Sequence, residues 1–316
     1  MNILITGSNG FVSKHLIGRL QGHKLSLVDR SPSVHPADFS FHQLDINGST
    51  DFSTALTGCE TVIHCAARVH IMGDAVENPL EAYRDVNTAG TITLAEQAVK
   101  AGVKRFIFIS SIKVNGESSR EGSPFKASDP HAYEDDYGQS KSEAEIELQH
   151  LADATGIELV VIRPTLVYGA GVKANFASLM NLVNKGVPLP FKCISNNKRS
   201  LVSVTNLADL IVTCIDHPKA ANQVFLVSDD KDVSTSEMVD YMAASLGKNK
   251  FQIPVPQKVF QIAGKVFGKS DVIDRLLGSL QVDITHTKQT LDWVPPQKIE
   301  DGFKEAASAI INSTEK

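Results

Sequence analysis

The chain has 316 residues, 42% of them hydrophobic and 21% charged, which is typical of a globular protein with one large α/β domain or two smaller ones. Its 31 Lys and Arg against 36 Asp and Glu give a net charge of -5, which argues against a nucleic-acid partner. Four scattered cysteines and ten histidines without ligand spacing indicate neither a disulfide framework nor a metal site. No leader or bilayer-spanning stretch is recognisable, so we expect a cytoplasmic protein with no membrane partner.

Short β-branched runs alternate with longer helical patterns through the first half of the chain. The expected strands are Asn2–Thr6, Lys24–Asp29, Phe41–Leu44, Thr61–Ala66, Lys104–Ser110 and Glu158–Arg163. Apolar residues at three- and four-residue spacing predict amphipathic helices over Phe11–Leu20, Leu80–Ala101 and Glu134–Ala154. This alternation predicts an α/β fold with a doubly wound parallel sheet covered by helices.

The regular alternation ends after residue 165, where glycine and proline residues mark a looser region. We therefore predict one domain over residues 1–165 and a smaller C-terminal lobe over residues 166–316 that mainly binds substrate. One later strand, Gln223–Val227, is expected to return to the first sheet, so that residues 222–228 belong to the first domain. A terminal helix is predicted over Lys304–Lys316.

A glycine-rich turn, Thr6–Ser13, joins the first strand to the first helix. Gly7 permits the turn and Gly10 allows close approach, while bare N–H groups and the helix dipole favour phosphate. Asp29 ends the second strand roughly 20 residues later, where an acid accepts hydrogen bonds from the adenosine ribose. These features predict a Rossmann-type domain that binds NAD, and Arg30 leaves NADP open. The alternative is a plain turn and a plain strand end.

Tyr137 and Lys141 lie four residues apart, so on a helix both project from one face. A nearby ammonium lowers the pKa of a tyrosine and makes the phenol usable as an acid and base toward a hydroxyl or ketone. A buried strand delivers Ser110 and Ser111 at its carboxyl end, where open α/β sheets bind ligands. Ser111 is the candidate that binds the reacting oxygen, and strand-end capping is the alternative role of both serines.

The order of these motifs resembles an extended short-chain dehydrogenase/reductase, in particular the NAD-dependent nucleotide-sugar epimerase/dehydratase family. The resemblance rests on the glycine turn, Asp29, Asp45-Ile46, His64–Ala67, Asn87, Ser110-Ser111, Tyr137–Lys141, Arg163-Pro164, Val167–Gly169, Arg199–Asp209 and Leu291–Pro295. It covers essentially the whole chain and implies a homodimer.

For catalysis, the resemblance implies that Tyr137 is the acid/base, that Ser111 orients the substrate oxygen, and that Lys141 binds the nicotinamide ribose and depresses the Tyr137 pKa. The residues expected to contact the cofactor are Gly7, Asn9, Gly10, Phe11, Val12, Asp29, Arg30, Asp45, Ile46, Ala66, Ala67, Asn87, Ser110, Tyr137, Lys141 and Pro164. Packing is the alternative role of Asp45, Ile46, Ala66, Ala67 and Asn87. His64, on an apolar strand, is expected to be a satisfied core histidine.

The residues expected to bind a UDP-sugar are Ser111, Lys113, Asn175, Phe191, Arg199 and Arg275. Arg199 and Arg275 are the candidate clamps on the diphosphate, because a guanidinium matches phosphate oxygens in a bidentate manner. Asn175 would donate to a phosphate and Phe191 would pack on the uracil. The alternatives are a surface position for Arg275 and a core position for Phe191.

The stretch after Ser111 lacks the Asp-Glu pair that a dehydratase of this family uses, which argues against dehydration. The leading hypothesis is an NAD(P)-dependent 4-epimerase that acts on a UDP-hexose or UDP-N-acetylhexosamine by Tyr-assisted hydride transfer at C4. Lys113 and Asn115 depart from the usual epimerase residues, so an NAD(P)H-dependent reductase of a UDP-4-keto-6-deoxy-hexosamine in surface-polysaccharide synthesis stays open. The alternative of another class is a non-catalytic dinucleotide-sensing regulator, which would need neither Tyr137 nor Lys141.

Overall fold

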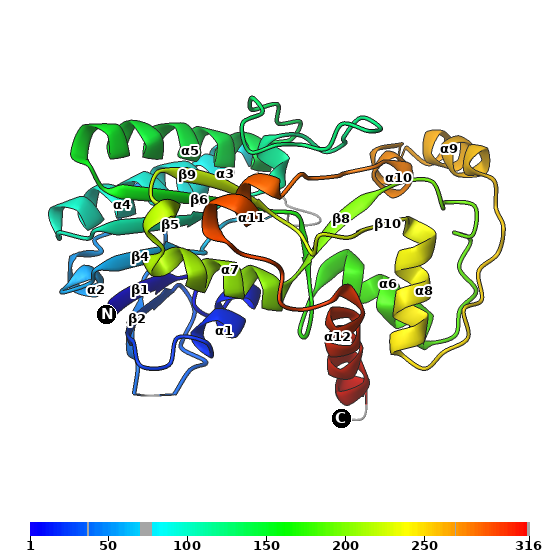
Figure 1. The fold of residues 1–316 in the computed structure, drawn as a ribbon, viewed down its shortest axis with the longest axis horizontal. Coiled ribbons are helices and arrows are strands. Elements are labelled where there is room, and N and C mark those ends of the chain that lie inside the picture. The colour runs from blue at the N-terminus through cyan, green and yellow to red at the C-terminus, as the bar shows by residue number, and fades with distance from the viewer. Residues whose placement is uncertain (37, 70–77, 269, 315–316) are drawn as a thin grey trace.

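The computed structural model describes residues 1–36, 38–69, 78–268 and 270–314 (Figure 1). A seven-stranded sheet, with the strand order β3-β2-β1-β4-β5-β6-β9, forms its larger part, and every neighbouring pair is parallel. The strands are β1 (Asn2–Thr6), β2 (Lys24–Asp29), β3 (Ser40–Gln43), β4 (Thr61–His64), β5 (Arg105–Ile109), β6 (Glu158–Pro164) and β9 (Gln223–Val227). This order is that of a doubly wound nucleotide-binding sheet, so the predicted fold class is confirmed.

Helices cover both faces of the large sheet, which explains why its central strands are apolar along their whole length. One face packs on α1 (Phe11–Ile17), α7 (Val204–Asp216) and α11 (Thr285–Leu291). The other face packs on α2 (Ser53–Leu56), α4 (Thr91–Lys100) and α5 (Asp136–Thr155). Strand β9 pairs with β6, as predicted for the returning strand. Helices α7 and α11 also pack on the large sheet, so this part of the molecule contains more of the second half of the chain than the predicted residues 222–228.

A second, smaller sheet has the order β10-β8-β7 and consists of β7 (Leu166–Tyr168), β8 (Arg199–Ser203) and β10 (Asp232–Val233). Three helices, α6 (Ala174–Asn184), α8 (Thr235–Ser245) and α12 (Ile299–Thr314), enclose a separate core with it. Tyr168 is fully buried there and its ring centroid lies 4.8 Å from that of Phe303. Helices α9 (Gln257–Val266) and α10 (Ser270–Leu277) lie at the end of the molecule remote from the large sheet (Figure 1).

Two predicted helices differ clearly from the observed ones, whereas Phe11–Leu20 and Glu134–Ala154 agree with α1 and α5 to within three residues at each end. The helix predicted over Leu80–Ala101 is divided into α3 (Pro79–Arg84), a π-helical segment (Asp85–Gly90) and α4. Gly90 lies so close to the segment after β3 that an added Cβ would be 2.7 Å from Ile46 Cγ2. The terminal helix begins at Ile299 rather than Lys304, because its first turns are buried in the smaller core. In the described ranges, no helix has the length and apolar character needed to cross a membrane.

Candidate active site

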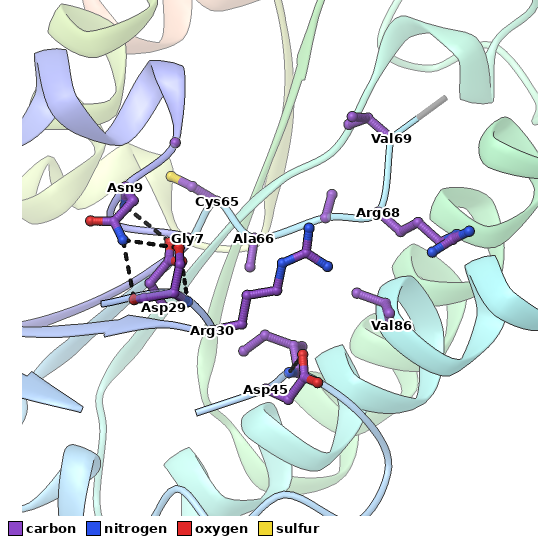
Figure 2. A pocket seen from close by; sticks show the side chains of 14 residues that line it. Gly7, Asn9, Asp29, Arg30, Asp45, Cys65, Ala66, Arg68, Val69 and Val86 are labelled. Atoms are coloured by element: carbon purple, nitrogen blue, oxygen red, sulfur yellow. Dashed lines mark hydrogen bonds between the residues drawn. The ribbon is translucent and has the colours of Figure 1, made fainter. Parts of the chain in front are cut away.

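A pocket of about 370 Å³ opens where β1, β2 and β4 end, at the edge of the large sheet (Figure 2). The strand order reverses between β1 and β4, and open α/β sheets bind ligands at such points. Nine of the residues predicted to contact a cofactor line it: Gly7, Asn9, Gly10, Asp29, Arg30, Asp45, Ile46, Ala66 and Ala67. The structure adds five residues that the sequence analysis did not propose as contacts: Ser31, Cys65, Arg68, Val69 and Val86.

The two glycines of the turn are required by close backbone contacts. Gly7 has φ +65°, and an added Cβ would lie 2.8 Å from the Cα of Ala66, so β1 and the segment after β4 meet only because this position is glycine. An added Cβ at Gly10 would lie 2.8 Å from the Gly7 carbonyl oxygen. Gly10 is also the N-cap of α1 and offers no capping side chain, so no such group covers the first N–H groups of that helix.

Asp29 ties the glycine turn to the loop after β2 (Figure 2). Its Oδ2 accepts a hydrogen bond from the Asn9 N–H at 3.0 Å, and its Oδ1 accepts from the Ser31 N–H and hydroxyl at 3.1 and 2.7 Å. The Asn9 side chain donates to the Pro32 carbonyl at 2.9 Å. A carboxylate has about four acceptor positions, and three are used here, so one remains for a ligand hydroxyl.

Ser111 and Tyr137 interact at the end of β5. Ser111 follows the strand and its Oγ accepts the Lys113 N–H at 3.2 Å, which caps a short 3-10 helix, as its alternative role predicted. Burial raises the pKa of Tyr137 to about 12, with a further contribution from the Asp135 carboxylate, while the Ser111 hydroxyl opposes the rise. The expectation that Lys141 holds this pKa below its ordinary value is therefore wrong for this structure, because burial and Asp135 outweigh any such effect.

Lys141 lies beneath the end of β5 and is 1% exposed. Its Nζ donates to the Ile109 carbonyl at 2.9 Å and lies 4.3 Å from the centre of the Phe108 ring. Burial lowers the pKa of this ammonium to about 8. The side chain is thus held on the strand that carries Ser111, one helical turn after Tyr137.

Asn87 connects the pocket wall to the helix that carries Tyr137. It lies in the π-helical segment, where its Oδ1 accepts the Arg68 N–H at 2.8 Å and its Nδ2 donates to the Arg68 carbonyl at 3.0 Å. The same Nδ2 donates to the Ser140 hydroxyl at 2.9 Å. Isolated π-helical turns often mark functional sites, and this one joins residue 68 to α5.

A buried network that the sequence analysis missed lies behind Ser111. Glu145 accepts hydrogen bonds from the Ser110 hydroxyl and from the Arg163 Nε, the latter at 3.0 Å. The Arg163 guanidinium also donates to Asn115 Oδ1 at 3.0 Å and contacts His131 Nε2 at 2.7 Å. Burial would raise the pKa of Glu145, but hydrogen bonds from His131 and Arg163 outweigh it and hold the pKa below its usual value. Glu145 follows Lys141 by one helical turn, which is the signal that could have revealed it.

Ion pairs and a hydrogen bond connect three of the predicted substrate residues, Lys113, Arg199 and Arg275, with two acids. The Lys113 Nζ lies 2.6 Å from Glu117 Oε1 and also pairs with Asp135. Glu117 Oε2 lies 3.1 Å from the Arg275 Nε, and the Arg199 Nη1 donates to the Arg275 carbonyl at 2.6 Å. The structure therefore brings Lys113, Arg199 and Arg275 together, and Glu117 is the acid between them.

The other predicted contacts lie elsewhere. Asn175 is exposed on α6, and Phe191 packs against Phe260 with ring centroids 6.0 Å apart. The pocket lining does not include Phe11, Val12, Asn87, Ser110, Tyr137, Lys141 or Pro164. His64 is a satisfied core histidine as expected, with Thr6 Oγ1 at 2.6 Å and Thr91 Oγ1 at 2.8 Å from its ring nitrogens. Among the residues that the structure describes, no three His, Cys, Asp or Glu side chains form a metal-binding group.

Comparison with known proteins agrees with this geometry. The model of the NAD dependent epimerase/dehydratase family matches residues 3–228. The chain is 58% identical to a UDP-glucose 4-epimerase of Vibrio cholerae over 316 residues, which cover 99% of this chain and 96% of that protein. It is 27% identical to an N-acetyl-α-D-glucosaminyl-diphospho-ditrans,octacis-undecaprenol 4-epimerase of Escherichia coli O157:H7, with 88% of this chain and 81% of that protein covered.

Solved structures share the fold. A UDP-glucose 4-epimerase from Thermotoga maritima with UDP-glucose superposes with a TM-score of 0.80, 22% identity and full coverage of both chains. A UDP-glucuronic acid 4-epimerase from Bacillus cereus in complex with NAD superposes with a TM-score of 0.79, 20% identity and 99% coverage of each chain. The chain is therefore an enzyme that belongs to the NAD dependent epimerase/dehydratase family.

Proposed function

We propose that this enzyme is an NAD-dependent UDP-sugar 4-epimerase that inverts C4 of a UDP-hexose, with UDP-glucose and UDP-galactose as the first pair to test. The observation that carries the proposal is the interaction of Ser111 with Tyr137 at the edge of the sheet that also holds the dinucleotide-type pocket. The high identity to a UDP-glucose 4-epimerase supports this reaction over others of the family.

The pocket fits NAD. Its glycine turn brings backbone against backbone, its helix α1 begins without a capping side chain, and Asp29 keeps an acceptor position at the end of β2. We assign the adenosine end of NAD to Asp29, Asp45 and Ile46, and the nicotinamide end to the part of the site near Tyr137 and Lys141. When bound, NAD supplies a reversible hydride acceptor for C4 of the sugar.

Tyr137 moves the proton of the C4 hydroxyl in this proposal. With a pKa of about 12 the phenol is protonated at neutral pH, so it is ready to return a proton to a C4 ketone. As a base it needs the ionised form, which the Ser111 hydroxyl favours. Ser111 thus orients the substrate oxygen, while Lys141, held on the Ile109 carbonyl, supplies a cation beside the nicotinamide ribose.

The diphosphate of the substrate is assigned to the guanidinium groups of Arg199 and Arg275. Arg275 is half exposed, and its contact with Glu117 shows that it already accepts an anionic partner. A guanidinium can bind two oxygens at once, and a diphosphate offers more such oxygens than one carboxylate does. Lys113, held between Glu117 and Asp135, lies two residues after Ser111 and is assigned to the sugar end.

The test is an equilibrium assay on the purified protein. Incubation with UDP-galactose is expected to yield UDP-glucose without added reductant, at the same final ratio that is reached from UDP-glucose. UDP-N-acetylgalactosamine, tested in parallel, decides whether the hexosamine pair is also accepted. If none of these UDP-sugars is converted by protein that retains NAD, the proposed epimerisation is wrong.

The reductase alternative is separated by the cofactor that the protein retains. An epimerase regenerates NAD within each turnover and is expected to release near-stoichiometric NAD when it is denatured and analysed by mass spectrometry. A reductase exchanges its cofactor, so an empty protein or released NADPH would favour reduction of a 4-keto sugar. The homodimer stays a prediction, and sedimentation at micromolar concentration tests it.

A further inference from the structure

Helices α9 and α10 form a hairpin with an apolar outer face. The two helices pack closely, because an added Cβ at Gly264 would lie 2.8 Å from Ile273 Cγ1. Val259, Ile262 and Val266 follow a spacing of three and four residues, so they share one face of α9. They are 50%, 63% and 72% exposed, and Phe267 at the end of the helix is 75% exposed. An apolar stripe of this kind on a described helix needs a partner.

The flank of this stripe is basic. Helix α9 carries Lys258 and Lys265 and neither Asp nor Glu, whereas the whole chain has a net charge of -5. Both lysines are exposed. Lys258 and Lys265 are seven residues apart and therefore form a second stripe along one flank of the apolar face. The helix combines apolar and cationic faces as interfacial membrane helices do.

We propose that the outer face of the α9–α10 hairpin docks on an anionic membrane surface. Val259, Ile262, Val266 and Phe267 enter the boundary between headgroups and acyl chains, and the lysines reach the lipid phosphates with their long stems along the apolar stripe. No spanning segment is required for this association. The proposal replaces the sequence-based expectation that the chain has no membrane partner.

Charge favours a membrane over a second copy of the chain. An interface with two-fold symmetry places the same surface on both sides, so the lysines of one hairpin would face those of the other. Helix α9 itself carries no acidic residue to neutralise them, and the acids of the hairpin, Asp271 and Asp274, belong to α10, where Arg275 follows them. A surface of anionic lipid supplies the missing charge and the apolar phase together.

The hairpin also borders the proposed substrate site. Arg275 belongs to α10, its carbonyl accepts from Arg199, and its guanidinium contacts Glu117. Membrane docking would therefore place the mouth of the substrate lobe next to the bilayer. The proposed membrane contact does not depend on the proposed reaction, so a membrane-binding experiment tests it independently.

The experiment is co-flotation of the full chain with vesicles of phosphatidylglycerol and phosphatidylcholine, compared with vesicles of phosphatidylcholine alone. The protein is expected to float with the anionic vesicles and to lose binding as salt rises. The double variant with Lys258→Gln and Lys265→Gln is expected to bind the anionic vesicles about 30-fold more weakly, because each lysine contributes to the binding free energy at an anionic surface. The double variant with Ile262→Gln and Val266→Gln is expected to weaken vesicle binding at least about tenfold, because less apolar surface leaves water.

Two matched pairs serve as controls, Leu182→Gln with Val187→Gln for exposed apolar residues and Lys100→Gln with Lys104→Gln for exposed lysines. They are expected to bind vesicles like the unchanged protein, and thermal melting checks that all variants are folded. Absence of binding to the anionic vesicles, or binding that survives both hairpin variants, overturns the proposal. If the Ile262 and Val266 variant instead splits a dimer in sedimentation, the face is an interface between copies.

Discussion

Two buried or half-buried arginines show how the two parts of this molecule differ. Arg163 lies in strand β6 of the large sheet, is 2% exposed and contacts Glu145, Asn115 and His131. Arg275 lies in the smaller part, its side chain is 50% exposed, and it meets Glu117 alone among the ion pairs of the described residues. The guanidinium of Arg163 is occupied by partners within the protein, whereas the guanidinium of Arg275 keeps N–H donors for a ligand.

The same contrast holds for the sites around them. At the edge of the large sheet, glycine contacts and the bonds of Asp29 shape the pocket through backbone geometry. In the substrate region, ion pairs between side chains join segments that are far apart in the chain, such as Lys113 with Asp135 and Glu117 with Arg275. We infer that the cofactor end is preformed, and that substrate anions exchange with the charges at the other end.

The largest expected effect comes from the acid/base on the side of the large sheet. Tyr137→Phe removes the hydroxyl that transfers the proton, so turnover is expected to fall about 10²- to 10⁴-fold, while the affinity for NAD stays unchanged. Single-turnover rates and fluorescence titration with NADH separate the two quantities. Tyr83→Phe is the control, since its ring contacts that of Tyr137 at 6.1 Å. If the Tyr137→Phe variant turns over as fast as the unchanged protein, Tyr137 is not the acid/base of the reaction.

Buried charge is tested next, through the free energy of unfolding. Arg163→Met removes the guanidinium from the buried Glu145 carboxylate, which then keeps only Ser110 and His131 as partners, and we expect a loss of about 3–5 kcal/mol in urea denaturation. The double variant with Glu145→Leu is expected to recover much of that loss, because both charges are gone.

The control lies two residues away on α5. Glu143 pairs with Arg84, whose side chain is 46% exposed, so Arg84→Met is expected to change stability by less than about 1 kcal/mol. A similar loss from Arg84→Met and Arg163→Met would contradict the distinction between the buried and the exposed pair.

The sequence predicted best those features that depend on neighbouring residues. The glycine turn, Asp29 at a strand end and the Tyr137 to Lys141 spacing are local patterns, and the structure places them at one edge of the sheet. Their energetics were not local, because the Tyr137 pKa depends first on burial by the surrounding fold. The hydrogen bond of Glu145 with Ser110 joins a helix to a strand 35 residues away, and the spacing of Glu145 one turn after Lys141 does not by itself reveal that partner. The pair of Glu117 with Arg275 likewise joins residues far apart in the chain.

A substitution of Arg275 tests the inference that the substrate region keeps charges for a ligand. Arg275→Ala is expected to raise the KM for a UDP-sugar about 10- to 100-fold with little change in kcat, since a charge-assisted hydrogen bond to a phosphate is lost. Urea denaturation of this variant is expected to match the unchanged protein, in contrast to Arg163→Met. Arg120→Ala, another exposed arginine, is the control. If Arg275→Ala lowers stability and leaves KM unchanged, the two arginines do not differ as we infer.

The smallest expected effect is a shift of the pH profile through Asp135, where the two parts meet. Asp135 accepts the Gly138 N–H at 2.7 Å and caps α5, and its charge contributes to the raised Tyr137 pKa after burial. Asp135→Asn keeps a capping oxygen but removes the charge, and Lys113 keeps Glu117 as its partner. The Tyr137 pKa must then fall, so the rise of kcat/KM with pH should move to lower pH. Glu117→Gln leaves the Asp135 charge in place and should leave that limb where it is, which separates the effect on Tyr137 from the loss of any carboxylate beside Lys113.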